Sequence, residues 1–317
     1  MLLRGEIVVN YKEITCSVAC HKLKRKIPFS WDLNIYRGCE HGCKYCYATY
    51  SHQYLDSERY FDDIYVKTNV VEQLEKQLSS PSWKREVVNI GGVTDSYQLI
   101  EAQCKLMPDI LRLMIKYRTP CIISTKSDLI LRDYDLIAEL ANINYVNVAA
   151  TITSMDENIR RLIEPNGAES IKRFAMLNEF AKTNASTGLH LMPIIPFITD
   201  GYENIDALYS NAADCDVDYV LPGVLYLRGK TRGVFFDFVR QELPHFYEPL
   251  QALYKTGGAS MEYKDKLYIT VNELKDKYKL SSSYSKPMKE KLNQFPSKQL
   301  SLFLSSFICA TNERTVY

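Results

Sequence analysis

The sequence predicts an α/β protein built on a parallel sheet. Between residues 32 and 227, short runs rich in Val, Ile and Tyr alternate with longer segments of helical period. This alternation is typical of repeated βα units, in which each helix packs against the sheet. The chain has 317 residues, 46% of them hydrophobic and 24% charged, which is enough for one large α/β domain with extensions. Periodicity alone allows either a barrel or a doubly wound sheet.

Six runs are predicted to form strands, and a seventh run is a further candidate. The predicted strands are 32–36, 63–67, 87–91, 121–125, 145–150 and 189–195, with 219–227 as the candidate. Apolar residues spaced three and four apart predict helices between them, each with one stripe toward the sheet. These stripes are Val71, Leu74 and Leu78; Ile100, Cys104, Met107, Leu111 and Met114; and Ile171, Phe174, Leu177 and Ala181.

Charge, cysteine number and the distribution of apolar residues indicate where the protein works, but they do not indicate its reaction. The formal net charge is +1, so no field of the whole protein selects a polyanionic partner. Nine cysteines, an odd number, favour a reducing compartment over a disulfide framework. Arg4 and Glu6 interrupt the first residues before an apolar segment of signal-peptide length accumulates, and no later run reaches the length of a membrane span. We therefore expect a cytoplasmic protein without a membrane partner.

Cys39, Cys43 and Cys46 form a C-x3-C-x2-C array just after the first predicted strand. Thiolates at this spacing bind a soft metal or an iron–sulfur cluster from a single loop. A closed structural site needs four ligands, and for zinc the only close fourth ligand would be His41 or His52. Three cysteines therefore indicate either a fourth ligand from elsewhere in the chain or a metal position that is left open for chemistry.

Two other regions carry weaker signals for binding. Cys16 and Cys20 are either a second metal half-site or plain packing, and nothing nearby completes a ligand set. Beyond residue 229 the βα pattern ends, and residues 255–298 hold ten Lys against five Asp or Glu. With the basic run 21–26, these lysines form either a surface for a nucleic acid or an acidic partner, or solvated helix faces that close the open side of the sheet.

The string YRGCEHGCKYCY at 36–47 places an aromatic residue, Tyr45, directly before the last cysteine of the array. It resembles the cluster motif of the radical S-adenosylmethionine (radical SAM) enzymes, and among them the spore photoproduct lyase-like branch, which includes proteins encoded in pairs on mobile elements. The resemblance implies that the three cysteines hold a [4Fe-4S] cluster whose fourth iron chelates the amino and carboxylate groups of S-adenosylmethionine. An electron from the cluster then cleaves the sulfonium to methionine and a 5'-deoxyadenosyl radical. The resemblance thus also implies an electron donor such as flavodoxin or ferredoxin.

The same resemblance covers roughly residues 30–230 and implies a partial (β/α)6 TIM-type barrel. The expected organisation is an N-terminal extension (1–30), the radical SAM partial barrel (31–229) and a basic and aromatic C-terminal extension (230–317). In parallel α/β barrels the chemistry collects on the loops at the carboxyl ends of the strands. The ends of the predicted strands are therefore where we expect the site.

After the third predicted strand, residues 91–98 form a turn whose glycines permit close backbone approach to a ligand. Thr94 and Asp95 offer a hydroxyl and a carboxylate that can bind an ammonium group and a ribose. Alternatively, Asp95 or Ser96 is only the N-cap of the next helix.

The later strand ends carry residues that the resemblance assigns to the cofactor. Lys126 matches a lysine that contacts the cofactor carboxylate in the lyase-like proteins, and Thr151 matches a serine that lies against the cofactor. Pro193 and Ile195 belong to a segment similar to one that flanks the adenine. Together with Tyr45, Thr94 and Asp95, these residues are the expected cofactor contacts.

Tyr45 and Tyr47, on either side of Cys46, match tyrosines proposed to relay the radical in spore photoproduct lyase. Alternatively, a tyrosine here only stacks on the cofactor. That lyase uses a cysteine near the end of the third strand to return a hydrogen atom to the product radical, whereas the matching residue here is Gly92. Because glycine has no side chain to donate, we do not expect this chain to be spore photoproduct lyase itself.

The expected function is a radical enzyme that abstracts hydrogen from a nucleic-acid base, a peptide or a protein. The alternative is a non-catalytic iron–sulfur or zinc protein that senses or binds through its basic extension. The polar residues at the strand ends favour the enzyme, because a sensor needs no cofactor pocket.

Overall fold

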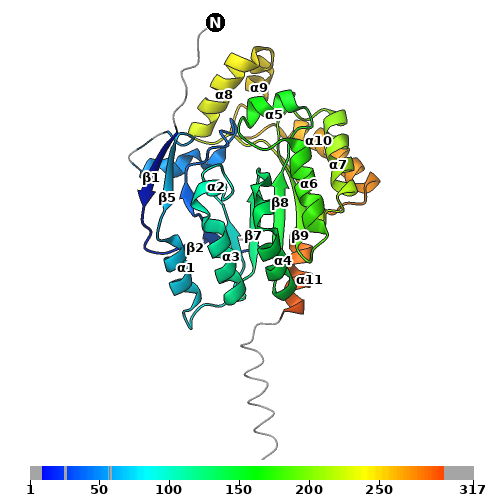
Figure 1. The fold of residues 1–317 in the computed structure, drawn as a ribbon. Coiled ribbons are helices and arrows are strands. Elements are labelled where there is room, and N and C mark those ends of the chain that lie inside the picture. The colour runs from blue at the N-terminus through cyan, green and yellow to red at the C-terminus, as the bar shows by residue number, and fades with distance from the viewer. Residues whose placement is uncertain (1–8, 25–26, 56, 58, 296–317) are drawn as a thin grey trace, which may run out of the picture.

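The computed structural model describes residues 9–24, 27–55, 57 and 59–295, in which helices surround a central sheet (Figure 1). Arg25 and Lys26 of the basic run, and residues 296–317 of the C-terminal extension, lie outside the described residues. Within the described part, the main sheet has seven strands: β2 (Cys20–Lys22), β3 (Trp31–Leu33), β6 (Val88–Ile90), β7 (Cys121–Thr125), β8 (Val146–Thr151), β9 (Ser186–Ile194) and β10 (Tyr219–Val224).

The strand order of this sheet is that of a partial barrel. From one edge it runs β10-β9-β8-β7-β6-β3-β2, and only β2 is antiparallel to its neighbour. The strands β6 to β10 follow one another in chain order, without the reversal that defines a doubly wound sheet. The sheet stays open, with edges at β2 and β10. The prediction of an α/β fold with a partial TIM-type barrel is confirmed.

The predicted strand at 63–67 exists, but it does not belong to the main sheet. β5 (Asp63–Lys67) lies between β1 (Asn10–Ile14) and β4 (Tyr36–Arg37) in a separate three-stranded sheet, and β3 pairs directly with β6. β1 pairs in parallel with all five residues of β5, from Asn10 opposite Asp63 to Ile14 opposite Lys67. In this separate sheet, β5 therefore pairs with a strand of the N-terminal extension instead of with a strand of the main sheet.

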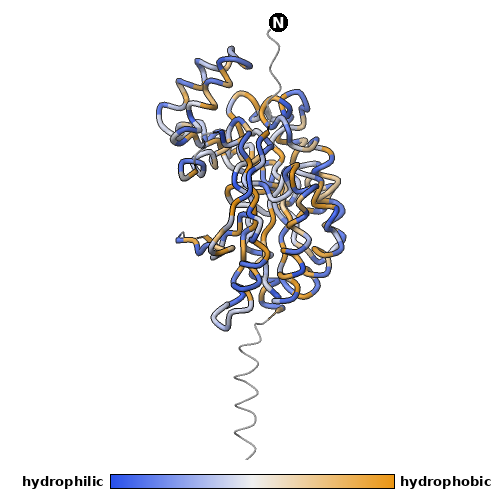
Figure 2. The backbone as a smooth tube through the Cα atoms, turned by 60° about the vertical axis from the view of Figure 1, so that its left-hand side comes forward, coloured by the Kyte–Doolittle hydropathy of each residue, from blue (hydrophilic) through white to orange (hydrophobic). Residues whose placement is uncertain are grey.

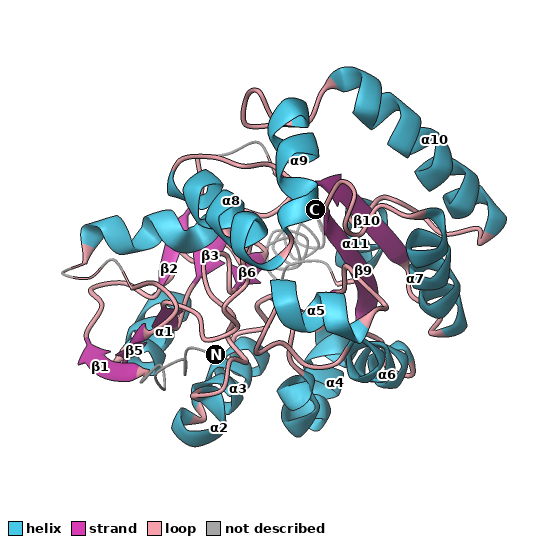
Figure 3. Cartoon of the chain, turned by 90° about the horizontal axis from the view of Figure 1, so that it is seen from above, coloured by secondary structure: helices cyan, strands magenta, loops and turns pink. Residues whose placement is uncertain are grey.

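Helices cover one face of the main sheet (Figures 1 and 3). They are α1 (Val70–Leu78), α3 (Leu106–Lys116), α4 (Tyr134–Ile143), α6 (Ser170–Ala181) and α7 (Tyr202–Asp214). Their buried side chains form one core with residues such as Leu33, Val88 and Leu189 of the strands. Figure 2 shows hydrophobic segments running through the middle of the molecule and hydrophilic ones along its outer surface. On the opposite face of the sheet, Asn89, Ser124 and His190 are half-buried, so this face carries polar side chains.

Two predicted helix stripes are wrong in detail. The stripe from Ile100 to Met114 is split between α2 (Glu101–Cys104) and α3, because Lys105 has a φ of 50° and interrupts the right-handed helical path. On α6, Ile171 is 58% exposed. Arg173 is buried instead, because its guanidinium pairs with a buried carboxylate, Glu164.

The C-terminal extension covers the site and both ends of the barrel. It contains α8 (Lys230–Glu242), α9 (Tyr247–Leu253), α10 (Met261–Lys277) and α11 (Ser285–Gln294). In Figure 3, α8 lies above the strands, and its Phe235 shares an apolar cluster with Cys43, Tyr45 and Ile195. At the other end, Met288 of α11 packs with Val87 and Tyr145. No helix in residues 9–295, where they are described, is both long and apolar enough to cross a membrane.

Candidate functional site

The three cysteines lie on one loop, residues 38–46, between β4 and the 3₁₀-helix η1 (Tyr47–Tyr54). This cluster loop turns at Gly38 and Gly42, whose φ angles of 83° and 67° fall in the region that favours glycine. At Gly38 a Cβ would also lie 2.7 Å from the carbonyl oxygen of Asp63. The two turns gather the cysteines, and Cys46 N donates to Cys43 O at 3.1 Å.

The surroundings of the thiols explain why they stay protonated without a metal. Burial raises the pKa of all three, that of Cys43 to about 12. Asp95, Cys43 and Cys46 raise the pKa of Cys39 further, because each would place a second negative charge beside it. Because a thiolate is the ligand form, binding iron would require these thiols to lose their protons.

The two histidines close to the array differ in what they offer to a metal. Both ring nitrogens of His41 are engaged, Nδ1 with Asn166 O at 3.1 Å and Nε2 with Asp95 Oδ2 at 2.8 Å. Nε2 of His52 bonds to Asp63 O at 3.0 Å, while its buried Nδ1 has no hydrogen-bond partner among the described residues. Three thiols on one loop fit a [4Fe-4S] cluster with one iron open to a small-molecule ligand, whereas a closed zinc site would need a fourth ligand such as Nδ1 of His52.

Asp95 joins the cluster loop to the end of β7. Its carboxylate accepts hydrogen bonds from the hydroxyl of Thr125 and the backbone N–H groups of Tyr97 and Lys126, and it contacts His41. Burial alone would raise the pKa of Asp95, but His41 and these donors lower it to about 2. Thr94 similarly donates to Gly38 O at 2.5 Å. The polar atoms of both residues are thus engaged within the protein.

Tyr45 belongs to a buried charged network that sequence reasoning missed. Its hydroxyl donates to Glu164, which pairs with Arg173 at 2.5 Å, and both charged side chains are fully buried. Arg173 also donates to Thr151 O at 2.7 Å. The network therefore connects the cluster loop to the end of β8. The available signal was an arginine on the apolar face of a helix, four residues before Leu177.

Lys126 lies between the array and this network. Its Nζ lies 5.7 Å from the centre of the Tyr45 ring. Burial lowers its pKa, but Cys43, when it is a thiolate, and the carboxylate of Glu164 raise the pKa more, so the side chain carries a positive charge. Its backbone N–H and C=O bond to Asp95 and Ala168, so the position of the backbone does not depend on the ammonium group.

The remaining expected contacts lie at neighbouring strand ends. Thr151 ends β8, Pro193 lies near the end of β9, and Ile195 is buried in the same apolar cluster as Cys43. Tyr47 lies apart from Tyr45: it is 62% exposed, and its hydroxyl donates to Gly92 O at 2.5 Å. The structure brings Tyr45, Lys126 and Ile195 to the cluster loop, while the contact of any of these residues with a cofactor stays a prediction.

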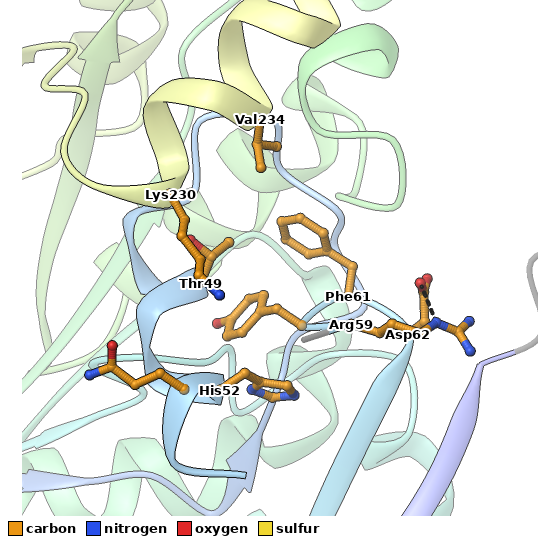
Figure 4. A pocket seen from close by; sticks show the side chains of 9 residues that line it. Thr49, His52, Arg59, Phe61, Asp62, Lys230 and Val234 are labelled. Atoms are coloured by element: carbon orange, nitrogen blue, oxygen red, sulfur yellow. Dashed lines mark hydrogen bonds and ion pairs between the residues drawn. The ribbon is translucent and has the colours of Figure 1, made fainter. Parts of the chain in front are cut away.

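A pocket of about 200 Å³ lies between η1 and the start of α8 (Figure 4). It is lined by Thr49, His52 and Gln53 of η1, residues 59–62, and Lys230 and Val234 of α8. The hydroxyl of Tyr60 donates to Val93 O at 2.6 Å, and its side chain packs in an apolar cluster with Cys39 and Cys46. One wall of this pocket is therefore next to the array.

Gly92 lies where a side chain would collide with a fixed carboxylate. A Cβ there would be 2.2 Å from Asp32 Oδ1, and Asp32 is held by Asn34 at 2.6 Å and Asn89 at 2.7 Å. We expect Gly92→Cys to lower the free energy of unfolding by about 1–3 kcal/mol through overpacking, measured by urea denaturation.

The matched control is Gly233→Cys, because a Cβ at Gly233 meets nothing within 4 Å. Adding Asp32→Ala to Gly92→Cys should recover part of the loss. Stability of Gly92→Cys equal to that of the unmodified chain would contradict the assignment of this contact.

The sequence of this chain is similar to a family model and to proteins of other organisms. Residues 33–208 match the model of the Radical SAM superfamily. An uncharacterized protein of Mycobacterium tuberculosis is 33% identical over 282 residues, covering 87% of this chain and 83% of its own length. An uncharacterized protein of Methanocaldococcus jannaschii is 31% identical over 176 residues, covering 55% of this chain and 64% of its own.

The fold is also similar to that of a solved enzyme. Spore photoproduct lyase complexed with dinucleoside spore photoproduct superposes with a TM-score of 0.63 at 13% identity, covering 84% of this chain and 79% of that one. A mutant of the same lyase with bound AdoMet gives the same TM-score at 12% identity. The match of the family model to more than half of the chain, together with the mycobacterial relative, establishes that this chain belongs to the radical SAM superfamily.

Proposed function

We propose that this protein is a radical SAM enzyme that holds a [4Fe-4S] cluster on Cys39, Cys43 and Cys46. When bound, the cluster supplies the electron that cleaves S-adenosylmethionine to methionine and a 5'-deoxyadenosyl radical, which abstracts hydrogen from a substrate. The observation that supports this most directly is the set of three thiols on one loop, next to a charged lysine. A reductant of the flavodoxin or ferredoxin class completes the proposal.

The residues around the array fit distinct tasks in this reaction. Lys126 provides a positive charge for the carboxylate of the cofactor, because a charge-assisted hydrogen bond is stronger than a neutral one. Pro193, which is half-buried, offers apolar surface for the adenine, and Ile195, which is buried in the apolar cluster with Cys43, is proposed to support the same contact. Asp95 acts as a positioning residue, since its carboxylate already accepts hydrogen bonds from the loop and from β7.

The substrate is proposed only as a nucleic-acid base, a peptide or a protein. Gly92 leaves no thiol where spore photoproduct lyase has its hydrogen donor, so repair of that lesion is not proposed. A non-catalytic role for the basic extension is not proposed either. In its described part, Lys266 and Lys277 pair with Glu262 and Asp206, as expected for ordinary solvated helices.

Anaerobic reconstitution tests the proposal. We expect iron and sulfide in the ratio of one [4Fe-4S] cluster per chain, and slow formation of 5'-deoxyadenosine when dithionite and S-adenosylmethionine are added. Stoichiometric zinc with no iron would refute the proposed function.

Lys126→Ala tests the cofactor side of the site. We expect ten- to hundredfold weaker binding of S-adenosylmethionine, measured by equilibrium dialysis, because one charge-assisted contact contributes about 1.5–3 kcal/mol. Iron content should stay the same, since the lysine is not a ligand.

Lys172→Ala is the matched control, because Lys172 is exposed and pairs only with the exposed Glu169 at 3.5 Å. If Lys126→Ala and Lys172→Ala bind S-adenosylmethionine with equal affinity, Lys126 is not a contact of the cofactor.

A further inference from the structure

His190 is a half-buried side chain that none of the roles above uses. It lies on β9 between Leu189 and Leu191, both of which belong to the core, so it points to the opposite, polar face of the sheet. Its register partner on β8 is Thr151, and the charge of Lys126, the residue directly after β7, acts on it. His190 therefore lies among three neighbouring strand ends at which cofactor contacts are expected.

A chain of hydrogen bonds fixes which nitrogen of His190 carries the proton. Asn147 Nδ2 lies 3.2 Å from Ser186 O, and since a carbonyl only accepts, the amide nitrogen must face it. Asn147 Oδ1 therefore faces Tyr219 and accepts the hydroxyl proton of Tyr219 at 3.0 Å. Burial raises the pKa of Tyr219, so this hydroxyl keeps its single proton.

Nε2 of His190 carries a proton and donates it to Tyr219. It lies 3.2 Å from the Tyr219 hydroxyl, and because the only proton of that hydroxyl points to Asn147, Nε2 must be the donor. Burial and the charge of Lys126 lower the pKa of His190 to about 4, so the ring is neutral at pH 7. Nδ1 then carries a lone pair, and no hydrogen bond to it is found among the described residues.

We propose that Nδ1 of His190 binds S-adenosylmethionine by accepting a hydrogen bond from a hydroxyl of its ribose. The inference rests on the proposed function and adds a specific contact to it. A ligand group that binds the lone pair of Nδ1 must donate a hydrogen bond, so phosphate and carboxylate oxygens, which carry no proton at neutral pH, are excluded. A positively charged donor is disfavoured because the ammonium group of Lys126 is nearby. A neutral sugar hydroxyl meets both conditions, and it belongs to the ligand that Thr151 and Lys126 are expected to contact.

The tautomer can be measured without any ligand. The chain has five histidines, so ¹⁵N-histidine labelling gives few signals, and the loss of one set in His190→Gln assigns His190. In the cluster-loaded protein before reduction, we expect a protonated Nε2 and an unprotonated Nδ1. Tyr219→Phe removes the acceptor and should shift His190 toward a mixture of tautomers. A protonated Nδ1 in the unmodified protein would overturn the inference.

Two substitutions separate the ligand contact from the structural one. His190→Gln keeps a donor near the position of Nε2 and removes the acceptor at Nδ1, whereas His190→Asn keeps an acceptor near Nδ1 and removes the donor to Tyr219. We expect S-adenosylmethionine to bind about tenfold more weakly to His190→Gln, which corresponds to one hydrogen bond, and to retain most of its affinity in His190→Asn. A purely structural role predicts the reverse order.

The 2'-deoxy and 3'-deoxy analogues of S-adenosylmethionine complete the test. The analogue that lacks the bonded hydroxyl should bind equally to the unmodified protein and to His190→Gln. If the unmodified protein binds S-adenosylmethionine and His190→Gln binds it equally well, the inference fails while the proposed function stands. If the unmodified protein binds no S-adenosylmethionine, the proposed function and the ligand contact both fail, whatever tautomer the spectra show.

Discussion

Cys43→Ala is expected to abolish both iron binding and the cleavage of S-adenosylmethionine. With only three local thiolates in the array, the loss of one leaves two ligands, too few to retain a cluster whose fourth iron has no protein ligand. The same loss is expected for Cys39→Ala and Cys46→Ala. Iron and sulfide analysis after anaerobic reconstitution, together with the yield of 5'-deoxyadenosine, measures the effect.

Cys16→Ser provides the control for this experiment. Cys16 is a half-buried cysteine, away from the array, whose backbone N–H donates to Asn69 Oδ1 at 2.8 Å. It should retain the full iron content. Circular dichroism of the metal-free proteins should show that all of these variants are folded. Iron in Cys43→Ala at the level found in Cys16→Ser would show that the array is not the cluster site.

Arg173→Ala is expected to have the largest effect on stability. It leaves the carboxylate of Glu164 buried without its ionic partner, and breaking a buried pair in this way costs about 3–5 kcal/mol. The substitution also removes the hydrogen bond to Thr151 O. We expect the midpoint of urea unfolding to fall sharply and the binding of S-adenosylmethionine to weaken with it.

Two variants make the result specific to the buried pair. Lys172→Ala, next to Arg173 on the same helix, removes an exposed ion pair and should change stability by less than about 0.5 kcal/mol. Glu164→Gln combined with Arg173→Met removes both charges and should recover much of the loss, because neither member of the pair is left charged without the other. A loss below about 1 kcal/mol in Arg173→Ala would contradict the strength assigned to this pair.

The parts of the fold that the sequence predicts well depend on local patterns. The strands β7 to β10 are apolar runs with a helix after each, and their positions agree closely with the structure. The array of cysteines is local too, because two glycine turns bring its members together within one loop. Each of these features is determined by residues close to one another in the chain.

The features that the sequence did not predict depend on distant partners. β5 leaves the main sheet because β1, a largely exposed strand with the sequence NYKEI, pairs along its whole length. Arg173 is buried because Glu164, at the end of another helix, is buried with it. The tautomer of His190 depends on Tyr219 and Asn147, which lie on two other strands. Periodicity and short motifs carry no information about such pairings.

Because α8 covers the cluster loop but lies far along the chain, the loop becomes buried only late in protein synthesis. The hydroxyl of Thr231 donates to Cys46 O at 3.0 Å across 185 residues of sequence, and Phe235 packs in the same cluster as Cys43. During synthesis the cluster loop leaves the ribosome long before α8, so its thiols spend that interval without their apolar cover. The buried setting of the array is thus completed only after most of the chain has been translated, and iron delivered earlier would meet an uncovered loop.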